Sequence, residues 1–71
     1  MNDNIRIGKR IADYRKLKRL TQSELAEAVG VSKGYIAAIE EGRRPRIKTL
    51  ARIAEFLDIK IELLFKDDLK Y

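Results

Sequence analysis

The side chains best suited to chemistry in this sequence are cations and amides rather than nucleophiles or metal ligands. The 71 residues include no cysteine and no histidine, so the commonest general base and the commonest zinc ligands are missing. Two adjacent carboxylates, Asp67 and Asp68, lie near the C-terminal end of the sequence, where exposure to solvent is the simplest interpretation. We therefore expect no catalytic residue, no metal site, no cofactor and no enzyme activity.

The cations are concentrated in two segments of the chain. Sixteen lysines and arginines face 11 aspartates and glutamates, which gives a net charge of +5. Residues 6–19 hold seven cations and one anion, residues 43–52 hold five cations and no anion, and residues 55–71 hold five anions and three cations. Clustered cations favour a polyanionic partner such as a nucleic acid. A basic surface without such a partner would have the same composition, so charge alone leaves both interpretations open.

No segment of the sequence predicts export or membrane insertion. The start of the chain lacks the apolar region of a signal peptide. The apolar run from Ile36 to Ile39 is far shorter than the ~20 residues that span a bilayer. The lack of cysteine is compatible with a reducing compartment, and we expect a cytoplasmic protein with no membrane contact.

Apolar residues recur at helical intervals outside the central part of the chain. Ile7, Ile11 and Tyr14, followed by Leu17, predict one face of a helix over residues 5–18. The same criterion predicts helices over residues 47–57 and 61–65. No segment shows the period-two alternation of a strand, so we expect no sheet.

Residues 21–42 predict two short helices joined by a tight turn. Thr21 and Glu24 form a capping-box pattern. Gly30 suits the left-handed residue that ends a helix, Ser32 is a good N-cap for the next helix, and Gly42 would end it. The apolar and small residues expected to pack the pair together are Leu25, Ala26, Val29, Val31, Ile36 and Ile39, with Ala28 in the same stripe. This combination predicts a helix-turn-helix, whose second helix enters the major groove of DNA.

Three stretches of the chain carry a family resemblance: "IGKRIADYRK", "TQSELAEAVGVSKGYIAAIEEGRRP" and "TLARIAEFLDI". Together they span most of residues 7–65, and the segment resembles the Cro/C1-type (Xre-like) helix-turn-helix domains of phage repressors and restriction–modification controller proteins. The resemblance implies an all-α, compact five-helix, lambda-repressor-like domain. We expect a single domain over residues 1–71, with its core at 7–65, a short arm at 1–4 and a tail at 66–71.

The resemblance also implies which residues face double-stranded DNA. They are Gln22, Ser32, Lys33, Gly34, Tyr35, Ala37, Ala38, Arg43, Arg44 and Arg46, and Lys48 would add to the phosphate contacts. Gln22 would bind a phosphate and brace a side chain of the recognition helix, unless it is only an exposed helix starter. Lys33 can donate to guanine N7 and O6, with a phosphate contact as its alternative. Ala37 could touch a thymine methyl group, although alanine suits any helix.

Tyr35 has two open interpretations, an approach to the DNA or a ring packed under the preceding helix. Gly34 and the two alanines make the recognition surface sparse, which suggests dependence on DNA shape and backbone. Arg19 occupies a position where relatives often have glycine, and this predicts that the first helix either ends with a strained cap or runs on differently. Arg46 replaces the usual Ser or Thr cap of the fourth helix, whose start should be less well capped.

Two further features follow from the resemblance. Arg15 and Glu40 match a pair that forms an ion pair between the first and third helices. Homodimerisation is expected because one such unit contacts only a few base pairs. Apolar residues late in the chain are the expected dimer interface: Phe56, Leu63, Phe65, Leu69 and Tyr71.

These inferences predict a sequence-specific transcriptional regulator that binds a near-palindromic operator as a homodimer and controls its own promoter. Because we expect no room in this chain for a ligand-binding second domain, we expect no small-molecule ligand, and regulation through protein concentration. The alternative is an antitoxin or another protein-interaction module in which DNA binding is secondary.

Overall fold

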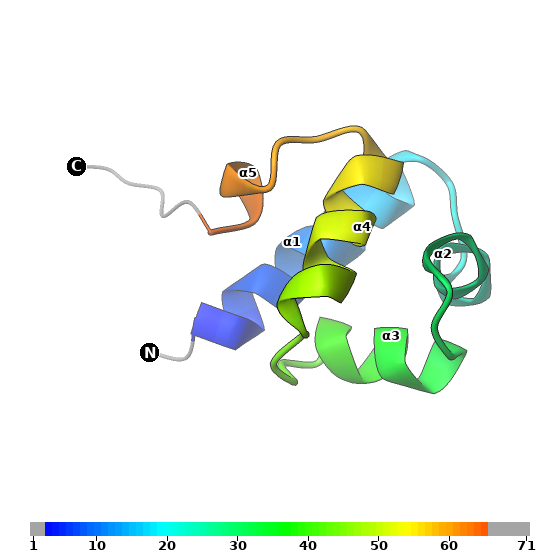
Figure 1. Ribbon diagram of the computed structural model, residues 1–71, viewed down its shortest axis with the longest axis horizontal. Coiled ribbons are helices and arrows are strands. Elements are labelled where there is room, and N and C mark those ends of the chain that lie inside the picture. The colour runs from blue at the N-terminus through cyan, green and yellow to red at the C-terminus, as the bar shows by residue number, and fades with distance from the viewer. Residues whose placement is uncertain (1–2, 66–71) are drawn as a thin grey trace.

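The computed structural model describes residues 3–65, and these form five helices and no strand (Figure 1). The helices are α1 (Asp3–Leu17), α2 (Gln22–Val29), α3 (Lys33–Glu40), α4 (Ile47–Leu57) and α5 (Glu62–Phe65). The predicted all-α class and the five-helix order are confirmed. The first helix begins earlier than expected, so residues 3 and 4 of the predicted arm are helical.

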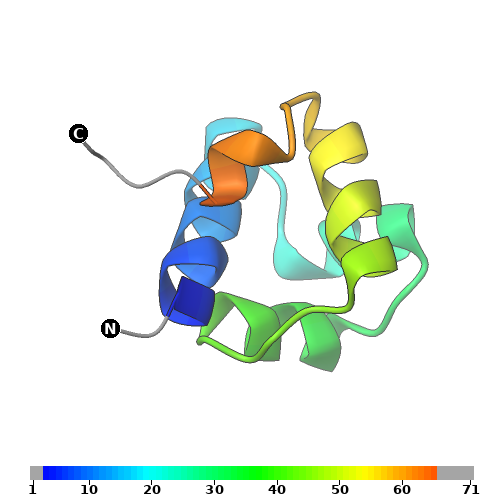
Figure 2. The same ribbon diagram turned by 60° about the vertical axis from the view of Figure 1, so that its left-hand side comes forward.

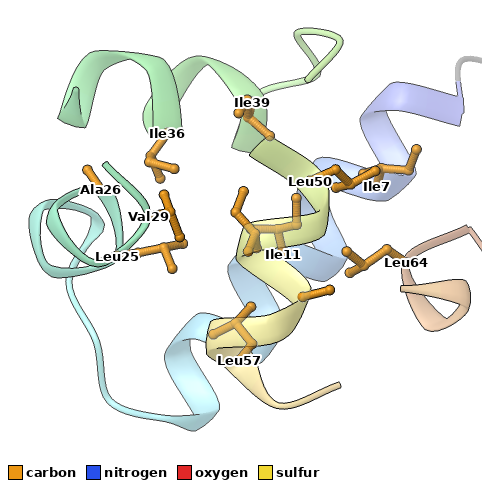
Figure 3. Close-up of a cluster of buried hydrophobic side chains, with 12 residues drawn as sticks. Ile7, Ile11, Leu25, Ala26, Val29, Ile36, Ile39, Leu50, Leu57 and Leu64 are labelled. Carbon is orange, nitrogen blue, oxygen red and sulfur yellow. The ribbon is translucent and has the colours of Figure 1, made fainter. Parts of the chain in front are cut away.

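All five helices contribute to one apolar core. Figure 3 shows side chains of α1, α2, α3, α4 and α5 converging on the space that the helices enclose. The buried apolar residues are Ile7, Ile11, Leu25, Ala26, Val29, Ile36, Ile39, Leu50, Ile53, Ala54, Leu57 and Leu64. The third helix packs on α1 and α2, while α4 packs on α1 and α2 from the other side (Figure 2). The orientation of α3 is therefore set by two neighbours at once.

Two apolar residues are not where the helical spacing predicted them. Leu17 is 77% exposed, because the inward position of the last turn of α1 belongs to Arg15. Two residues further along an α-helix is about 200° around its axis, so Leu17 faces outward. Ala28 is also exposed, and the buried stripe of α2 consists of Leu25, Ala26 and Val29.

The ends of the helices follow the predicted local chemistry. Arg19 has a φ of 59°, and the amide of Leu20 donates to the carbonyl of Arg15 at 3.1 Å, as in a Schellman end. The strained end of α1 is thus confirmed, since a left-handed conformation costs a non-glycine residue roughly 1–2 kcal/mol. Arg46 is the N-cap of α4 and makes no side-chain capping hydrogen bond, also as predicted.

Candidate nucleic-acid interface

The second and third helices form the predicted helix-turn-helix. Thr21 and Glu24 exchange both hydrogen bonds of the capping box, at 2.8 and 3.0 Å. Gly30 ends α2 with a φ of 80°, and its amide donates to the carbonyl of Ala26. Ser32 then caps α3 by accepting from the amide of Tyr35 at 3.1 Å. The turn therefore needs only residues 30–32, and it places the start of α3 beside the end of α2.

Small and branched side chains hold this helix pair together. Ala26 is 3% exposed and Ile36 is fully buried. Figure 3 shows Ala26 and Val29 of α2 facing Ile36 of α3, with Leu25 pointing into the main core. A side chain larger than alanine at position 26 would push the two helices apart, which is why this position requires a small residue.

The outer face of α3 is open and carries few large side chains. In Figure 1, α3 lies along the lower edge of the molecule, with no other helix beneath it. Four of the predicted base-facing residues lie on this helix. Lys33 and Gly34 are exposed, and Ala37 and Ala38 are half-buried. A Cβ atom added to Gly34 would meet only the Ser32 hydroxyl, at 4.0 Å. Within 4 Å, the described residues thus leave this position of the helix open.

An ion pair connects the end of the recognition helix to α1. The Arg15 guanidinium donates to both carboxylate oxygens of Glu40, from Nε at 2.7 Å and from Nη2 at 3.1 Å. A third bond runs from Arg15 Nη1 to the carbonyl of Leu20 at 2.6 Å. Only 10% of the Arg15 side chain and 7% of the Glu40 side chain are exposed. The hydrogen bond to Glu40, supported by its charge and opposed by burial, raises the pKa of Arg15 above its ordinary value.

Gln22 joins the same network. Its amide nitrogen donates to Glu40 Oε1 at 3.0 Å, so the first residue of α2 contacts the last residue of α3. The predicted bracing of a recognition-helix side chain is present in the structure. Gln22 is half-buried, which means that its amide is held in place rather than moving freely at an exposed helix start.

Tyr35 lies between the recognition helix and the loop that follows it. Its hydroxyl accepts a hydrogen bond from the backbone amide of Arg46 at 2.9 Å. The Arg43 guanidinium stacks over its ring, with Cζ 5.1 Å from the centroid. The ring is half-buried against the core. Tyr35 therefore contacts the basic loop, an arrangement that neither of the two sequence interpretations anticipated.

The residues of the basic loop make different contacts. The Arg43 guanidinium and the Arg46 backbone amide contact Tyr35, whereas Arg44 lines a groove between the starts of α1 and α4 and the end of α5. This groove has a volume of about 440 Å³. Its other lining residues are Asp3, Asn4, Ile7, Pro45, Ile47, Leu50 and Phe65.

Three of the residues predicted for a dimer interface are exposed apolar side chains. Phe56 is 44%, Leu63 38% and Phe65 51% exposed, while Leu69 and Tyr71 lie outside the described residues. Ile47, which the sequence did not single out, is 77% exposed and lines the same groove as Phe65. An exposed isoleucine at the first position of an amphipathic helix was the available signal.

Gly8 is a second residue that sequence reasoning missed. A Cβ atom at this position would come within 2.1 Å of the carbonyl oxygen of Ile39, so α1 and α3 cross in direct backbone contact there. An isolated glycine inside a helical pattern often marks such a contact. Gly8 therefore belongs to the residues that set the orientation of α3.

Two further findings concern other kinds of site. Among residues 3–65, no three or more acidic, histidine or cysteine side chains gather in a way that could hold a metal ion. No helix in the same part of the chain is long and apolar enough to cross a membrane.

A capped helix pair, a tight glycine turn and an open second helix flanked by cations define a helix-turn-helix DNA-binding domain. A family model described as "Helix-turn-helix" matches residues 11–64. The chain belongs to the Cro/C1-type helix-turn-helix family, whose members are DNA-binding transcription regulators.

Similar proteins support this membership in sequence and in structure. The "ImmF control region 10 kDa protein" of Bacillus phage phi105 is 43% identical over 90% of this chain and 72% of its own length. The restriction–modification controller protein C.AhdI from Aeromonas hydrophila superposes with a TM-score of 0.85 at 30% identity, over 92% of this chain and 100% of that chain.

The biofilm regulator SinR, solved in complex with DNA, superposes with a TM-score of 0.79 at 40% identity, over 84% of this chain and 98% of that chain. The full-length SinR of Bacillus licheniformis is longer, and this chain spans 62% of it at 41% identity.

Proposed function

We propose that this chain is a sequence-specific transcriptional regulator that inserts α3 into the major groove of double-stranded DNA. The observation that carries the proposal is the open face of α3, with Lys33 at its start and the basic loop at its end. An α-helix fits the major groove, and a lysine there can donate to the acceptors of guanine. Gly34 has no side chain, and the side chains of Ala37 and Ala38 are single methyl groups, which would let the helix backbone approach the bases closely.

The proposed phosphate contacts surround this helix. The amide groups at the start of α2 are partly positive, and Gln22 is held there by Glu40 with an N–H to spare for a phosphate oxygen. Ser32 is exposed at the start of α3. The basic loop follows the recognition helix, and its residues Arg43, Arg44 and Arg46 would contact DNA phosphates beyond the end of α3. These contacts set affinity and register, whereas Lys33 supplies the base preference.

We propose further that the protein binds a near-palindromic operator as a homodimer. A single recognition helix reads few base pairs, and two half-sites about 34 Å apart raise both affinity and specificity. The exposed residues Ile47, Phe56, Leu63 and Phe65 offer apolar surface for a two-fold mate, as isologous interfaces require. Autoregulation at the chain's own promoter and a location in the cytoplasm complete this proposal, with the phage and controller relatives as its analogy.

Salt-dependent DNA binding tests the proposal. The chain is titrated against the duplex upstream of its gene and against a scrambled duplex of equal length, at several salt concentrations. We expect tighter binding to the upstream duplex, and a logarithmic affinity that falls by ~0.9 per neutralised phosphate for each logarithmic unit of salt. Equal binding to both duplexes, together with tight co-purification of a neighbouring gene product, would instead favour the antitoxin or interaction-module function.

A further inference from the structure

We infer that Tyr35 is a positioning residue that fixes the basic loop, residues 43–46, to the recognition helix. The inference rests on the proposed function in one respect, because the loop is assigned the phosphate contacts there. The contacts that carry it are internal to the protein: the hydroxyl of Tyr35 with the backbone of Arg46, and the ring of Tyr35 with the guanidinium of Arg43.

Tyr35 is itself held rigidly. It is the third residue of α3, and its amide donates to the Ser32 hydroxyl that caps the helix. Its ring packs partly buried against the core. A side chain fixed at both its backbone and its ring can serve as a reference point for whatever its hydroxyl binds.

The loop is tied to α3 at both ends. At its start, the amide of Arg43 donates to the carbonyl of Ala38 at 2.9 Å. At its end, the amide of Arg46 donates to the Tyr35 hydroxyl at 2.9 Å. Arg46 is the N-cap of α4 and has no side-chain cap of its own. The tyrosine hydroxyl therefore accepts from the N-cap amide, which is the role of the acidic side chain in a capping box.

The ring contributes separately from the hydroxyl. The Arg43 guanidinium lies 5.1 Å from the ring centroid, within the ~6 Å over which a cation and an aromatic face attract. Stacking restricts the orientations of a long side chain before any ligand arrives. Less conformational freedom then remains to be lost when the guanidinium meets a phosphate.

Lys33 and the loop cations consequently move as one body. Lys33 is two residues before Tyr35 on the same helix. The loop is held to Tyr35 by two contacts, one from the Arg46 amide and one from the Arg43 guanidinium. Base reading and phosphate binding are thus kept at a fixed spacing. On this basis Tyr35 tunes DNA binding through the loop and needs no contact of its own with a base.

Replacing Tyr35 with phenylalanine separates the two contacts. Tyr35→Phe keeps the ring and its stacking on Arg43 but removes the acceptor for the Arg46 amide. Tyr14→Phe is the matched control, because within residues 3–65 the half-buried Tyr14 hydroxyl has no hydrogen-bond partner. Hydrogen exchange of individual amides is measured on the free proteins, and affinity for the upstream and scrambled duplexes is measured as a function of salt.

Tyr35→Phe should speed exchange of the Arg46 amide and weaken binding to both duplexes alike by roughly two- to tenfold, as for one lost hydrogen bond. The salt slope should become shallower by ~0.9 for each phosphate contact that the displaced loop loses. Tyr14→Phe should change none of these quantities.

Three results would overturn the inference. Unchanged exchange at Arg46 would show that the hydroxyl does not hold the loop. Weaker DNA binding with an unchanged salt slope would indicate a direct contact from the neutral hydroxyl to DNA, which displaces no counterion. Faster exchange with unchanged affinity would show that the position of the loop is irrelevant. Failure of the unaltered protein to prefer the upstream duplex would count against the proposed function. The exchange result would still test whether the Tyr35 hydroxyl holds the Arg46 amide.

Discussion

At the scale of single residues, the recognition helix shows a conflict between stability and the proposed function. Lys33 is the first residue of α3, where the helix dipole is positive and favours acidic side chains. The first turn of α3 contains no acid. A cation at this position is slightly destabilising for the free protein, and its presence is consistent with a negatively charged partner.

Lys33→Glu should therefore stabilise the free domain by about 0.3–1 kcal/mol and strongly weaken DNA binding. Thermal denaturation measures the first effect, and titration with the upstream duplex measures the second. Lys33→Ala should relax base preference at one position at a cost of about 1–3 kcal/mol, whereas Arg43→Ala should weaken binding to all sequences alike. Identical specificity profiles for the alanine variants would refute the division between base reading and phosphate binding.

Two glycines on neighbouring helices should respond in opposite ways to the same substitution. A Cβ atom at Gly34 meets open space, so Gly34→Ala should stabilise the fold by about 0.5–1 kcal/mol through helix propensity. Gly8→Ala should destabilise it by about 1–3 kcal/mol or more, because the new methyl group would collide with the backbone of α3. Denaturant unfolding measures both, and two changes of the same sign would contradict the close crossing of α1 and α3.

At the scale of the helices, three elements meet at Glu40. Glu40 is the last residue of α3, and it accepts hydrogen bonds from Arg15 of α1 and from Gln22 of α2. The carboxylate is nearly buried, and its oxygens receive bonds from both partners. The network fixes the end of the recognition helix, where Gly8 of α1 also meets the backbone of Ile39 and Glu40, while the contact with α2 at Ile36 fixes its middle.

Glu40→Ala should cost roughly 3–5 kcal/mol of unfolding free energy, because it leaves the Arg15 charge buried and unpaired. Glu40→Gln retains an acceptor and should cost less. The pKa of Arg15 is raised in the fold, so its contribution is fully present below its ordinary pKa and is lost only in strong alkali. The difference between the unaltered protein and Glu40→Ala should consequently stay constant from pH 7 to pH 10. A small or strongly alkali-dependent difference would contradict the buried pair.

At the scale of the whole molecule, the proposed DNA-binding surface and the apolar groove lie mainly on different helices. The open face of α3 carries Lys33 and small residues, while Ile47 and Phe65 line a groove at the starts of α1 and α4. The two surfaces meet at the basic loop, because Arg44 and Pro45 also line the groove. This arrangement would allow a two-fold mate and a duplex to bind at the same time.

Ile47→Glu should prevent dimerisation and leave monomer stability nearly unchanged, because the side chain is 77% exposed. Leu17→Glu is the matched control, since Leu17 is equally exposed. The groove lies at the start of α1, whereas Leu17 is the last residue of that helix. Sedimentation equilibrium reports the oligomeric state, and operator binding should weaken only for Ile47→Glu. Unaltered dimerisation in Ile47→Glu would exclude this groove from the interface.

The amino-acid sequence alone was enough to define the boundaries of the helix pair and one buried face of α1. Thr21, Gly30 and Ser32 set the boundaries of the helix pair through contacts within a few residues, and the spacing of Ile7 and Ile11 identified a buried face. These features can be predicted because capping, turn conformation and helical periodicity depend on neighbours along the chain. The resemblance of the same segments to a known family added the pairing of Arg15 with Glu40, which no local rule predicts.

Only the tertiary structure decided the rest. Gly8 and Gly34 both sit inside helices, yet one touches a carbonyl oxygen of another helix and the other faces open space. Leu17 continues an apolar spacing but is exposed, and the partner of the Tyr35 hydroxyl is 11 residues away along the chain. For Gly8 and for the Tyr35 hydroxyl, the deciding neighbour lies in another element of the fold. Its distance and direction are set by how the helices pack, so they exist only once the core has formed.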